Sequence, residues 1–592
     1  MLRGALPRAS TVLSSRHATI TRISIACEPG QQSELFMKPR ALVPLVHHCR
    51  SSSSSADSGI EDLKGNRLDF NDMSIAYRSR TVLELLRASL VFSFCRPLIV
   101  RNADQLLSLS RRVFGNTLTD AVVRETFFKH FCGGEDAASI RPTVNRLASQ
   151  GIGSILDYAA ESDIESGNGP SHGSRSEDRR TIICRTYTYE DEQQCDKNAN
   201  IFKQAIRAVG TAGGSVPFAA VKVTALGPPE LLQRVSACLV EMRNFFSRLD
   251  LNQDGIIERE EWIEACESLF NGTKEEFGMW FDEKHRSPAV APNSTGIDYA
   301  EWLETLTLKD LPPLLSRCKA RGPLSAAQLE DGEMELLEAS RRRAREIAQE
   351  AKQNGVRLLV DAEHTYFQPA IDLVTLELMR EFNTPGSAAT IFNTYQAYLK
   401  DAELRLATDM ERSRRLGYGF ACKVVRGAYL EHETAHAAKK GLPNPIHNSL
   451  EETHACYNRC LLKVLESVTP GRPGGAEVMV ASHNQASVEY AVEEMRKLGL
   501  GPQDAVYFGQ LYGMSDHLTS TLGTAGYRAY KYLPWGPVQE VTPYLLRRAQ
   551  ENSAVVGGAK VELKNLWQEL KARCGFRRAA PAPAPTSLAG QV

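Results

Sequence analysis

The sequence predicts an α/β protein built on a (β/α)8 barrel, with a helical region before the barrel and a helical subdomain inserted into it. Short apolar runs recur eight times after residue 150, and longer amphipathic stretches separate them. Before residue 150 the apolar residues have the spacing of helices, and such runs are absent. About 130 residues separate the second run from the third, where a crossover between parallel strands ordinarily needs far fewer. These three features define the barrel, the lead-in and the insert.

The helical lead-in is expected at residues 65–150. Within it, residues 81–94 and 102–114 space their apolar side chains three and four positions apart, which is the period of an amphipathic helix. Because the polar side chains fall between them, each segment has one face that can pack on a core.

The two ends of the chain have biased compositions. Residues 1–55 carry six arginines among serines and threonines, with Glu28 and Glu34 as their acids, which is typical of a mitochondrial transit peptide. A disordered tail is the alternative for this segment. Residues 576–592 are rich in alanine and proline and are expected to be disordered.

The eight apolar runs supply the strands of a barrel expected at 151–228 and 350–575. They lie at residues 151–158, 217–226, 356–365, 389–396, 419–430, 478–484, 505–513 and 526–536. The carboxyl ends of such strands carry the chemistry of a barrel enzyme. Several runs hold a polar side chain there: Asp157, Lys222, Asp361, Gln396, Arg426, His483 and Tyr532. One such residue could be a surface charge just past a strand, but seven together indicate a site, because buried strands do not ordinarily hold unpaired cations.

Composition excludes several classes of protein. The 592 residues carry a formal net charge of -1, so no global field draws the chain to nucleic acid. The 13 cysteines include no CxxC pair, which argues against a disulfide framework and a structural zinc site and favours a reducing compartment. No segment reaches the roughly 18 unbroken apolar residues of a membrane span. Any membrane contact is therefore expected to be peripheral.

The insert, expected at 229–349, contains an EF-hand-like loop, "DLNQDGIIEREE", between two segments with helical spacing. Its side-chain oxygens, one backbone carbonyl and one bidentate carboxylate stand at the positions of a calcium loop. The expected ligands are Asp250, Asn252, Asp254, the Ile256 carbonyl and Glu261, with Gly255 at the sharp turn and Glu258 at position nine. A loop held by hydrogen bonds without metal is the alternative.

A second, incomplete loop follows in the insert. Residues 294–306 match the exit half of an EF-hand partner, and Glu301 takes the twelfth position. Val290, Pro292 and Ser294 then stand where the first ligands should be. This loop is therefore not expected to bind calcium.

Two adjacent arginines stand on a helix near the end of the chain, in "PYLLRRAQEN". Arg547 and Arg548 point about 100° apart and can converge on one small anion at the end of the helix. Guanidinium suits a carboxylate, because it donates two parallel hydrogen bonds. Glu551 stands four residues after Arg547 and can hold its rotamer, and Tyr544 shares the face of the pair. A solvated helix with a local ion pair is the alternative.

These segments together resemble the proline dehydrogenase family. The resemblance rests on "YLLRRAQEN", "KVVRGAYL", "LVDAEHT" and "ASHN", at 544–552, 423–430, 359–365 and 481–484. It runs in order from about residue 68 to 575 and includes the lead-in and the EF-hand insert of the animal mitochondrial branch. It implies a distorted (β/α)8 TIM barrel that binds FAD and oxidises L-proline to Δ1-pyrroline-5-carboxylate, the first step of proline catabolism. It also implies electron transfer to ubiquinone and a peripheral place on the matrix side of the inner mitochondrial membrane.

The resemblance also implies roles for the residues of the substrate site. Arg547, Arg548 and Lys222 would hold the carboxylate of proline, Glu551 would orient the arginines, and Asp361 would keep Lys222 charged and aimed. The ring of the substrate would be walled by Tyr429, Leu511, Tyr532 and Tyr544.

For the cofactor, the resemblance implies that Arg426, Gly427 and Ala428 form the turn that contacts the flavin, with arginine in place of the family's frequent lysine. Gln396 would bond the edge of the isoalloxazine ring, and His483 and Asn484 would lie toward the ribose and adenine. Neither a GxGxxG loop nor a P-loop is present, so strand ends must hold the nucleotide.

Two other functions stay open. The first is a hydroxyproline dehydrogenase, a sister group in which the residue corresponding to Tyr532 is smaller and polar; the tyrosine here favours proline. The second is a calcium-responsive barrel without catalysis, against which the intact arginine pair, Lys222 and Asp361 argue.

Overall fold

The computed structural model describes residues 68–136, 138–159, 162–165, 183–186, 191–210, 216–285, 295–471, 475–554 and 558–574. The expected transit peptide at 1–55 and the expected tail at 576–592 lie outside the described residues. Within the described part, no helix combines the length and the hydropathy that a membrane-spanning segment needs.

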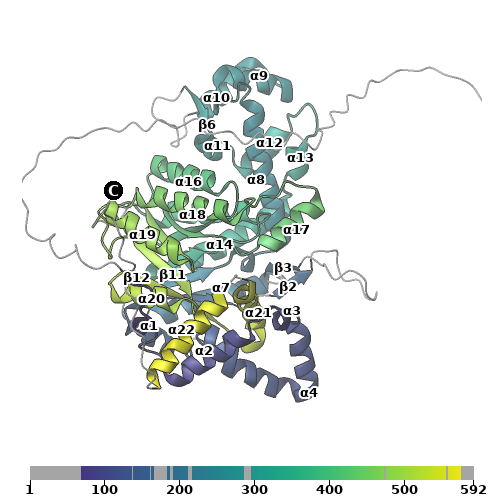
Figure 1. Ribbon diagram of the computed structural model, residues 1–592. Coiled ribbons are helices and arrows are strands. Elements are labelled where there is room, and N and C mark those ends of the chain that lie inside the picture. Colours follow the sequence, from purple (N-terminus) through teal and green to yellow (C-terminus); the bar gives the residue numbers. More distant parts are fainter. Residues whose placement is uncertain are drawn as a thin grey trace, which may run out of the picture.

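Eight parallel strands close into a barrel, as the sequence predicts (Figure 1). They are β1 (Ile152–Tyr158), β4 (Phe218–Val221), β7 (Arg357–Val360), β8 (Ile391–Gln396), β9 (Ala421–Val425), β10 (Glu477–Ala481), β11 (Val506–Leu511) and β12 (Arg528–Trp535). Each strand lies beside the next barrel strand in chain order, and β1 closes the ring against β12, with Ile155 opposite Tyr532. Every one of the eight apolar runs is a barrel strand.

Helices surround the barrel. They are α7 (Glu192–Gly210), α14 (Asp331–Gln353), α15 (Gln368–Phe382), α16 (Ala402–Leu416), α17 (Leu430–Lys440), α18 (Leu450–Leu465), α19 (Gln485–Lys497) and α20 (Asp516–Thr524). α14 packs on α7, α15 and β7. The chain therefore returns to the barrel at residue 331, earlier than the residue 350 expected from the sequence.

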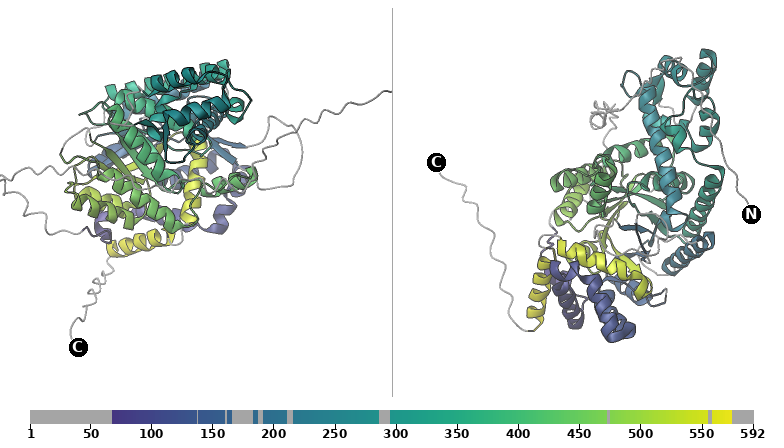
Figure 2. Two further views of the ribbon diagram at one scale, coloured as in Figure 1. Left: turned by 90° about the horizontal axis from the view of Figure 1, so that it is seen from above. Right: turned by 90° about the vertical axis from the view of Figure 1, so that its right-hand side faces the viewer.

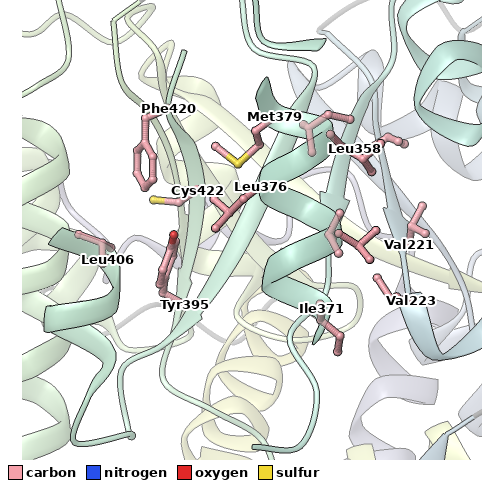
Figure 3. Packing of buried hydrophobic residues seen from close by; sticks show 14 of the residues in the cluster. Val221, Val223, Leu358, Ile371, Leu376, Met379, Tyr395, Leu406, Phe420 and Cys422 are labelled. Carbon is pink, nitrogen blue, oxygen red and sulfur yellow. The ribbon is translucent and has the colours of Figure 1, made fainter. Parts of the chain in front are cut away.

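The barrel interior is packed with side chains rather than open. Phe218 lies 5.4 Å from Phe392, 5.3 Å from Tyr507 and 5.1 Å from Tyr530 between ring centroids, all edge to face. A second layer lies outside the strands, where α15 directs Ile371, Leu376 and Met379 toward them (Figure 3). Each such side chain contributes about 1.5–3 kcal/mol by leaving water. A filled interior leaves the strand ends for chemistry.

The lead-in is helical, as predicted, and packs beside the end of the chain (Figures 1 and 2). Its main helices are α2 (Val82–Phe94), α3 (Pro97–Arg101), α4 (Ala103–Val123) and α6 (Arg141–Ala148), and the short α1 (Met73–Ala76) precedes them. The closing helices α21 (Val538–Ala554) and α22 (Gly558–Arg573) contact them: α22 lies against α2, and α21 against α3.

The insert stands at the end of the molecule opposite to the lead-in (Figure 2). Its helices are α8 (Pro229–Leu249), α9 (Arg259–Leu269), α10 (Lys274–Lys284), α11 (Tyr299–Thr305), α12 (Leu311–Leu315) and α13 (Pro323–Ala327). Short strands β5 (Ile256–Glu258) and β6 (Gly296–Asp298) pair antiparallel, with Ile257 opposite Ile297. The two helix–loop–helix units are thus joined through their loops. Val290, Pro292 and Ser294 lie outside the described residues.

Candidate active site

Asp361 is the centre of a polar cluster at the carboxyl ends of the strands. It directly follows β7, and its carboxylate accepts a hydrogen bond from the Tyr532 hydroxyl at 2.7 Å and from Lys423 Nζ at 2.5 Å. Lys222, which directly follows β4, lies 3.5 Å from Asp361 and 3.1 Å from Asp157. Three strands of the barrel, β4, β9 and β12, therefore bring two ammonium groups and one hydroxyl to the carboxylate that follows β7.

The charges in this cluster reinforce one another. Burial alone would raise the pKa of Asp361, but the ammonium groups of Lys423 and Lys222 lower that pKa below its ordinary value. Burial, together with Asp157 and Asp361, raises the pKa of Tyr532 well above its ordinary value. Asp361 is therefore a carboxylate and Tyr532 a neutral hydroxyl at neutral pH.

Lys423 is a member of this cluster that the sequence analysis did not select. It stands within β9 between apolar neighbours and is 7% exposed. A lysine in the middle of a barrel strand is the same signal that pointed to Lys222, because an ammonium group cannot stay buried without a carboxylate. That signal was available in the "ACKVV" run.

The predicted arginine pair lies on α21, stacked on Tyr544. The guanidinium carbons of Arg547 and Arg548 lie 5.8 and 4.9 Å from the centroid of the Tyr544 ring. Glu551 accepts from Arg548 at 2.7 Å, three residues away, whereas the sequence analysis expected it to hold Arg547. A separation of three residues on a helix brings side chains together as readily as four.

α21 crosses the mouth of the barrel instead of lying on its outer wall. The hydroxyl of Tyr158, the last residue of β1, donates to Glu540 of α21 at 2.9 Å. Tyr544 is buried, which raises its pKa, and it lies within electrostatic range of both Arg548 and Asp157. Within the described residues, neither the Tyr544 hydroxyl nor Nε of Arg548 has a hydrogen-bond partner. These buried polar atoms are free to meet a ligand.

Two apolar wall positions stand beside this cluster. Leu511 ends β11 and lies opposite Tyr532 in the sheet register. Tyr429 is the N-cap residue of α17, after β9, and its ring centroid lies 4.2 Å from that of His364. Together with Tyr532 and Tyr544 they bring hydrocarbon and ring surface to the strand ends.

Arg426, just beyond β9, is a cation held by neutral groups. It donates to Ser482 at 2.6 Å, to Ser487 at 2.7 Å and to Nδ1 of His454 at 3.0 Å, and it stacks on Tyr457 at 4.5 Å. No described carboxylate pairs with it. A half-buried guanidinium without a counter-ion suits a phosphate or pyrophosphate group.

Gly427 and Gln396 also have the features of a binding surface. Gly427 has φ +133°, and a Cβ there would collide with the ring of Tyr398, so only glycine fits this turn. Its neighbour Ala428 is exposed. Gln396 ends β8 and is buried, yet its Oε1 has no hydrogen-bond partner among the described residues. A buried amide oxygen without a partner points to a missing donor.

His483 and Asn484 are half-buried and have structural partners. His483 contacts Oγ of Ser515 through Nδ1 at 3.0 Å, and burial with nearby Lys531 lowers its pKa to about 3. It is therefore neutral at physiological pH. Asn484 caps α19 by accepting from the backbone of Ser487. Oγ of Ser487 in turn accepts a hydrogen bond from Arg426, so the N-terminus of α19 and the Arg426 guanidinium are linked.

The loop of the insert has the backbone of the predicted calcium site. Gly255 adopts φ +91°, and the Asp250 carboxylate accepts from the amides of Asp254 and Gly255. Glu261 accepts from the amides of Asn252 and Glu258. Among the described residues, however, no group of three or more His, Cys, Asp and Glu side chains is placed to hold a metal ion. The loop has the order and turn of a calcium loop, with its carboxylates bonded to backbone amides.

Comparison with known proteins gives consistent matches. Residues 140–560 match the sequence model of the family described as "Proline dehydrogenase". Human "Proline dehydrogenase 1, mitochondrial" is 38% identical over 545 residues, which cover 86% of this chain and 90% of that protein. The protein of the same name from Caenorhabditis elegans is 37% identical over 557 residues, covering 86% and 89%.

Two further matches are more distant. "Hydroxyproline dehydrogenase" of Xenopus laevis is 33% identical over 509 residues, covering 86% of this chain and 90% of that protein. Proline utilization A of Bdellovibrio bacteriovorus, a solved structure, aligns with a TM-score of 0.47 and 17% identity. The alignment covers 83% of this chain but only 41% of that longer one.

Proposed function

This chain belongs to the proline dehydrogenase family, and from that premise we propose that it is an oxidoreductase that converts L-proline to Δ1-pyrroline-5-carboxylate with FAD as cofactor. The observation that carries the proposal is a pair of buried donor atoms at the barrel mouth. Nε of Arg548 and the hydroxyl of Tyr544 are buried and have no hydrogen-bond partner among the described residues. A guanidinium and a hydroxyl that lie together in this way suit a substrate with a free carboxylate.

The arginine pair would bind that carboxylate. Tyr544 stacks beneath both guanidinium groups, and Glu551 fixes Arg548, so the forks are ordered before the substrate arrives. Nε of Arg548 and the Tyr544 hydroxyl are buried without partners among the described residues, which supports a ligand there. Lys222, held by Asp157 and Asp361, would add the third cation.

The pyrrolidine ring would lie against Tyr429, Leu511, Tyr532 and Tyr544. The hydroxyl of Tyr532 is committed to Asp361, so the ring of Tyr532 presents a fixed face to the substrate. Because its pKa is lowered, the Asp361 carboxylate is a poor proton acceptor, and it stays charged and can hold the cations beside it. We assign it the positioning of Lys222, Lys423 and Tyr532.

Three residues fit the cofactor. Arg426 lacks a carboxylate partner and would meet the pyrophosphate; Gly427 would let the backbone approach, beside Ala428; and Gln396 would use its unpartnered Oε1 at the edge of the flavin. His483, neutral, and Asn484 would lie toward the ribose and adenine. FAD, when bound, accepts the hydride from the substrate.

The family relation also supports a cellular setting. The human and nematode relatives are named mitochondrial, and we propose the same compartment, with ubiquinone as the electron acceptor and a peripheral contact with the matrix side of the inner membrane. L-proline is preferred over hydroxyproline, because the proteins named hydroxyproline dehydrogenase are less similar and Tyr532 closes the ring site.

The EF-hand-like loop of the insert is proposed to bind one Ca2+. The helix–loop–helix arrangement, the positive φ of Gly255 and the ligand order from Asp250 to Glu261 support this role. Binding would require the carboxylates to turn from backbone amides to the ion.

One measurement tests the main proposal. The purified protein is expected to be yellow, and anaerobic L-proline is expected to bleach the flavin absorbance faster than trans-4-hydroxy-L-proline does. A colourless protein that binds no FAD would support a barrel without catalysis. A flavin that hydroxyproline reduces faster would assign the chain to the sister activity.

A further inference from the structure

The lead-in helices expose an unusual amount of apolar surface. Twelve of the twenty-three large hydrophobic side chains that are exposed in the described structure lie between residues 82 and 122. Single exposed leucines are ordinary, but a contiguous set on consecutive helices marks an interaction surface. We call this set the apolar stripe.

α2 is apolar on two opposite faces. Leu85, Ala88 and Phe92 are buried, in a cluster with α22. Leu83, Leu86, Leu90 and Phe94 follow the helical period on the other face and are exposed, Leu83 to 74%. A helix that is hydrophobic all round is ordinarily buried all round. The second face of α2 therefore lacks its partner within the described residues.

The stripe continues into the next two helices. Leu98 of α3 is 77% exposed, and α4 exposes Leu106, Leu109, Val113 and Phe114 before Leu118 and Val122. In α4 the backbone departs from the helix at Gly115, with φ +78°. The stripe is therefore a bent line of side chains along three helices, not one compact patch.

Arginines flank the stripe, and two of its acids, Glu84 and Asp120, are paired. Arg96, Arg101 and Arg112 are exposed, and they form no ion pair with any described residue. Glu84 is paired with Arg146, and Asp120 is bonded to Arg111 and Gln539. Among the side chains that the structure describes along the stripe, the exposed charges without an ion pair are thus basic, although the whole chain is almost neutral.

We propose that the apolar stripe of α2, α3 and α4 docks on the surface of a bilayer that contains anionic phospholipid. Apolar side chains would enter the boundary of the acyl region while the arginines meet lipid phosphates, as in interfacial helices. A second copy of this chain fits less well, because a two-fold interface would set the same basic surface against itself. No described helix is long and apolar enough to span the bilayer, so the contact is interfacial.

The stripe lies one layer of side chains from the candidate active site. Val91 of α2 packs in one cluster with Val541 and Tyr544 of α21, and Cys95 and Val100 pack on Ala549, which follows Arg548. Docking would hold the barrel mouth close to the bilayer, where a lipid-soluble quinone is dissolved. This role in electron transfer to a quinone rests on the proposed function, whereas the docking of the stripe on a bilayer does not.

Co-sedimentation of the full chain with vesicles tests the docking surface. Binding is expected to be stronger to vesicles of phosphatidylcholine with phosphatidylglycerol than to phosphatidylcholine alone. The double variant Leu83→Gln, Leu90→Gln should bind more than about tenfold more weakly, because two leucines no longer enter the interface. The double variant Arg96→Gln, Arg101→Gln should lose about tenfold of the preference for anionic vesicles.

A matched pair of leucines serves as the control. Leu404 of α16 and Leu450 of α18 are exposed to 55% and 61% and lie away from the lead-in, so Leu404→Gln, Leu450→Gln should bind vesicles like the wild type. Equal melting temperatures would show that each variant folds. Absence of vesicle binding by the wild type, or wild-type binding by the stripe variant, would overturn the proposal. So would a dimer that only the stripe variant dissociates while vesicle binding is unchanged.

The two proposals fail separately. If L-proline still bleaches the flavin but the protein does not bind vesicles, only the docking surface is overturned. A chain that binds vesicles through the stripe but holds no proline-reducible flavin would support the docking surface and overturn the proposed reaction.

Discussion

Lys423 Nζ lies 2.5 Å from Asp361 Oδ1, although the two residues belong to strands that are not neighbours. Asp361 follows β7 and Lys423 stands in β9, with β8 between them. Since Asp361 also holds Lys222 and Tyr532, one carboxylate fixes the positions of three groups at the strand ends.

Replacing Asp361 should destabilise the protein in a pH-dependent way. The folded-state pKa of Asp361 is lowered below its unfolded value, so its stabilising contribution is present above the unfolded pKa of about 4 and is lost as pH falls through the folded value. Asp361→Asn leaves two buried lysines without this partner, which costs about 3–5 kcal/mol at neutral pH. The melting temperature should therefore fall clearly at pH 7, and the difference from wild type should shrink below about pH 4.

The control for this prediction is Asp282→Asn in the insert. Its pair with Arg259 is about half exposed and should contribute no more than about 1 kcal/mol. A difference between Asp361→Asn and wild type that stays constant from neutral to acid pH would contradict the assigned charge of Asp361.

Loss of either arginine of the pair should weaken proline binding. Arg547→Met or Arg548→Met removes a charge-assisted contact with the carboxylate, at a cost of roughly 1.5–3 kcal/mol, which raises KM for proline at least about tenfold. Bound FAD should remain, because neither residue belongs to the proposed cofactor surface. Steady-state kinetics and the flavin spectrum measure both. Unchanged KM in both variants would mean that the two arginines have a structural role and do not contact the substrate.

Glu551→Gln should weaken proline binding less than loss of Arg548 does. Glu551 accepts from Arg548 at 2.7 Å and is proposed to hold its rotamer, not to touch the substrate. Its neutral variant keeps the shape of the side chain and removes part of the attraction. An effect on KM larger than that of Arg548→Met would give Glu551 a different role.

Tyr532 should decide between proline and its hydroxylated form. Tyr532→Ser opens space beside the ring and adds a hydroxyl group that can bond a ring hydroxyl, so relative kcat/KM should shift toward trans-4-hydroxy-L-proline. Tyr532→Phe serves as the matched control: it keeps the ring, loses the bond to Asp361, and should keep the preference for proline with lower turnover. An unchanged ratio in Tyr532→Ser would remove Tyr532 from the specificity of the site.

The insert should bind one Ca2+ per chain. Isothermal titration calorimetry is expected to give one site, and Glu261→Gln should weaken it strongly, because the bidentate carboxylate is lost. Glu301 is the control: it takes the corresponding place in the second loop, but it is buried and bonded to His285 at 3.0 Å, so Glu301→Gln should not change the number of sites. Two ions per chain, or none at millimolar calcium, would contradict the prediction that the first loop alone binds calcium.

Much of the barrel could be predicted from local pattern. All eight apolar runs became strands, because a strand buried on both faces needs continuous apolar residues and its crossover needs an amphipathic helix. Arg547 and Arg548 lie on a helix with Tyr544 as expected, since a helix fixes the relation of residues three and four apart. The calcium-loop sequence likewise gives the turn at Gly255.

Contacts between distant segments were decided by tertiary structure. Lys423 and Asp361 meet only because the barrel closes and its lumen directs both inward, which no local period encodes. Glu551 can reach either arginine along its own helix, and the structure shows that its ion pair with Arg548 forms at 2.7 Å. The sequence of α2 is apolar on both faces and would suit a helix buried all round. In the fold one face packs on α22 and the other is exposed, because burial depends on which other elements pack against the helix. The sequence determines the helices, the strands and their side-chain chemistry, because these depend on short-range sterics and hydropathy. The pairing of charges from distant segments and the burial of each apolar face depend on the packing of the whole chain.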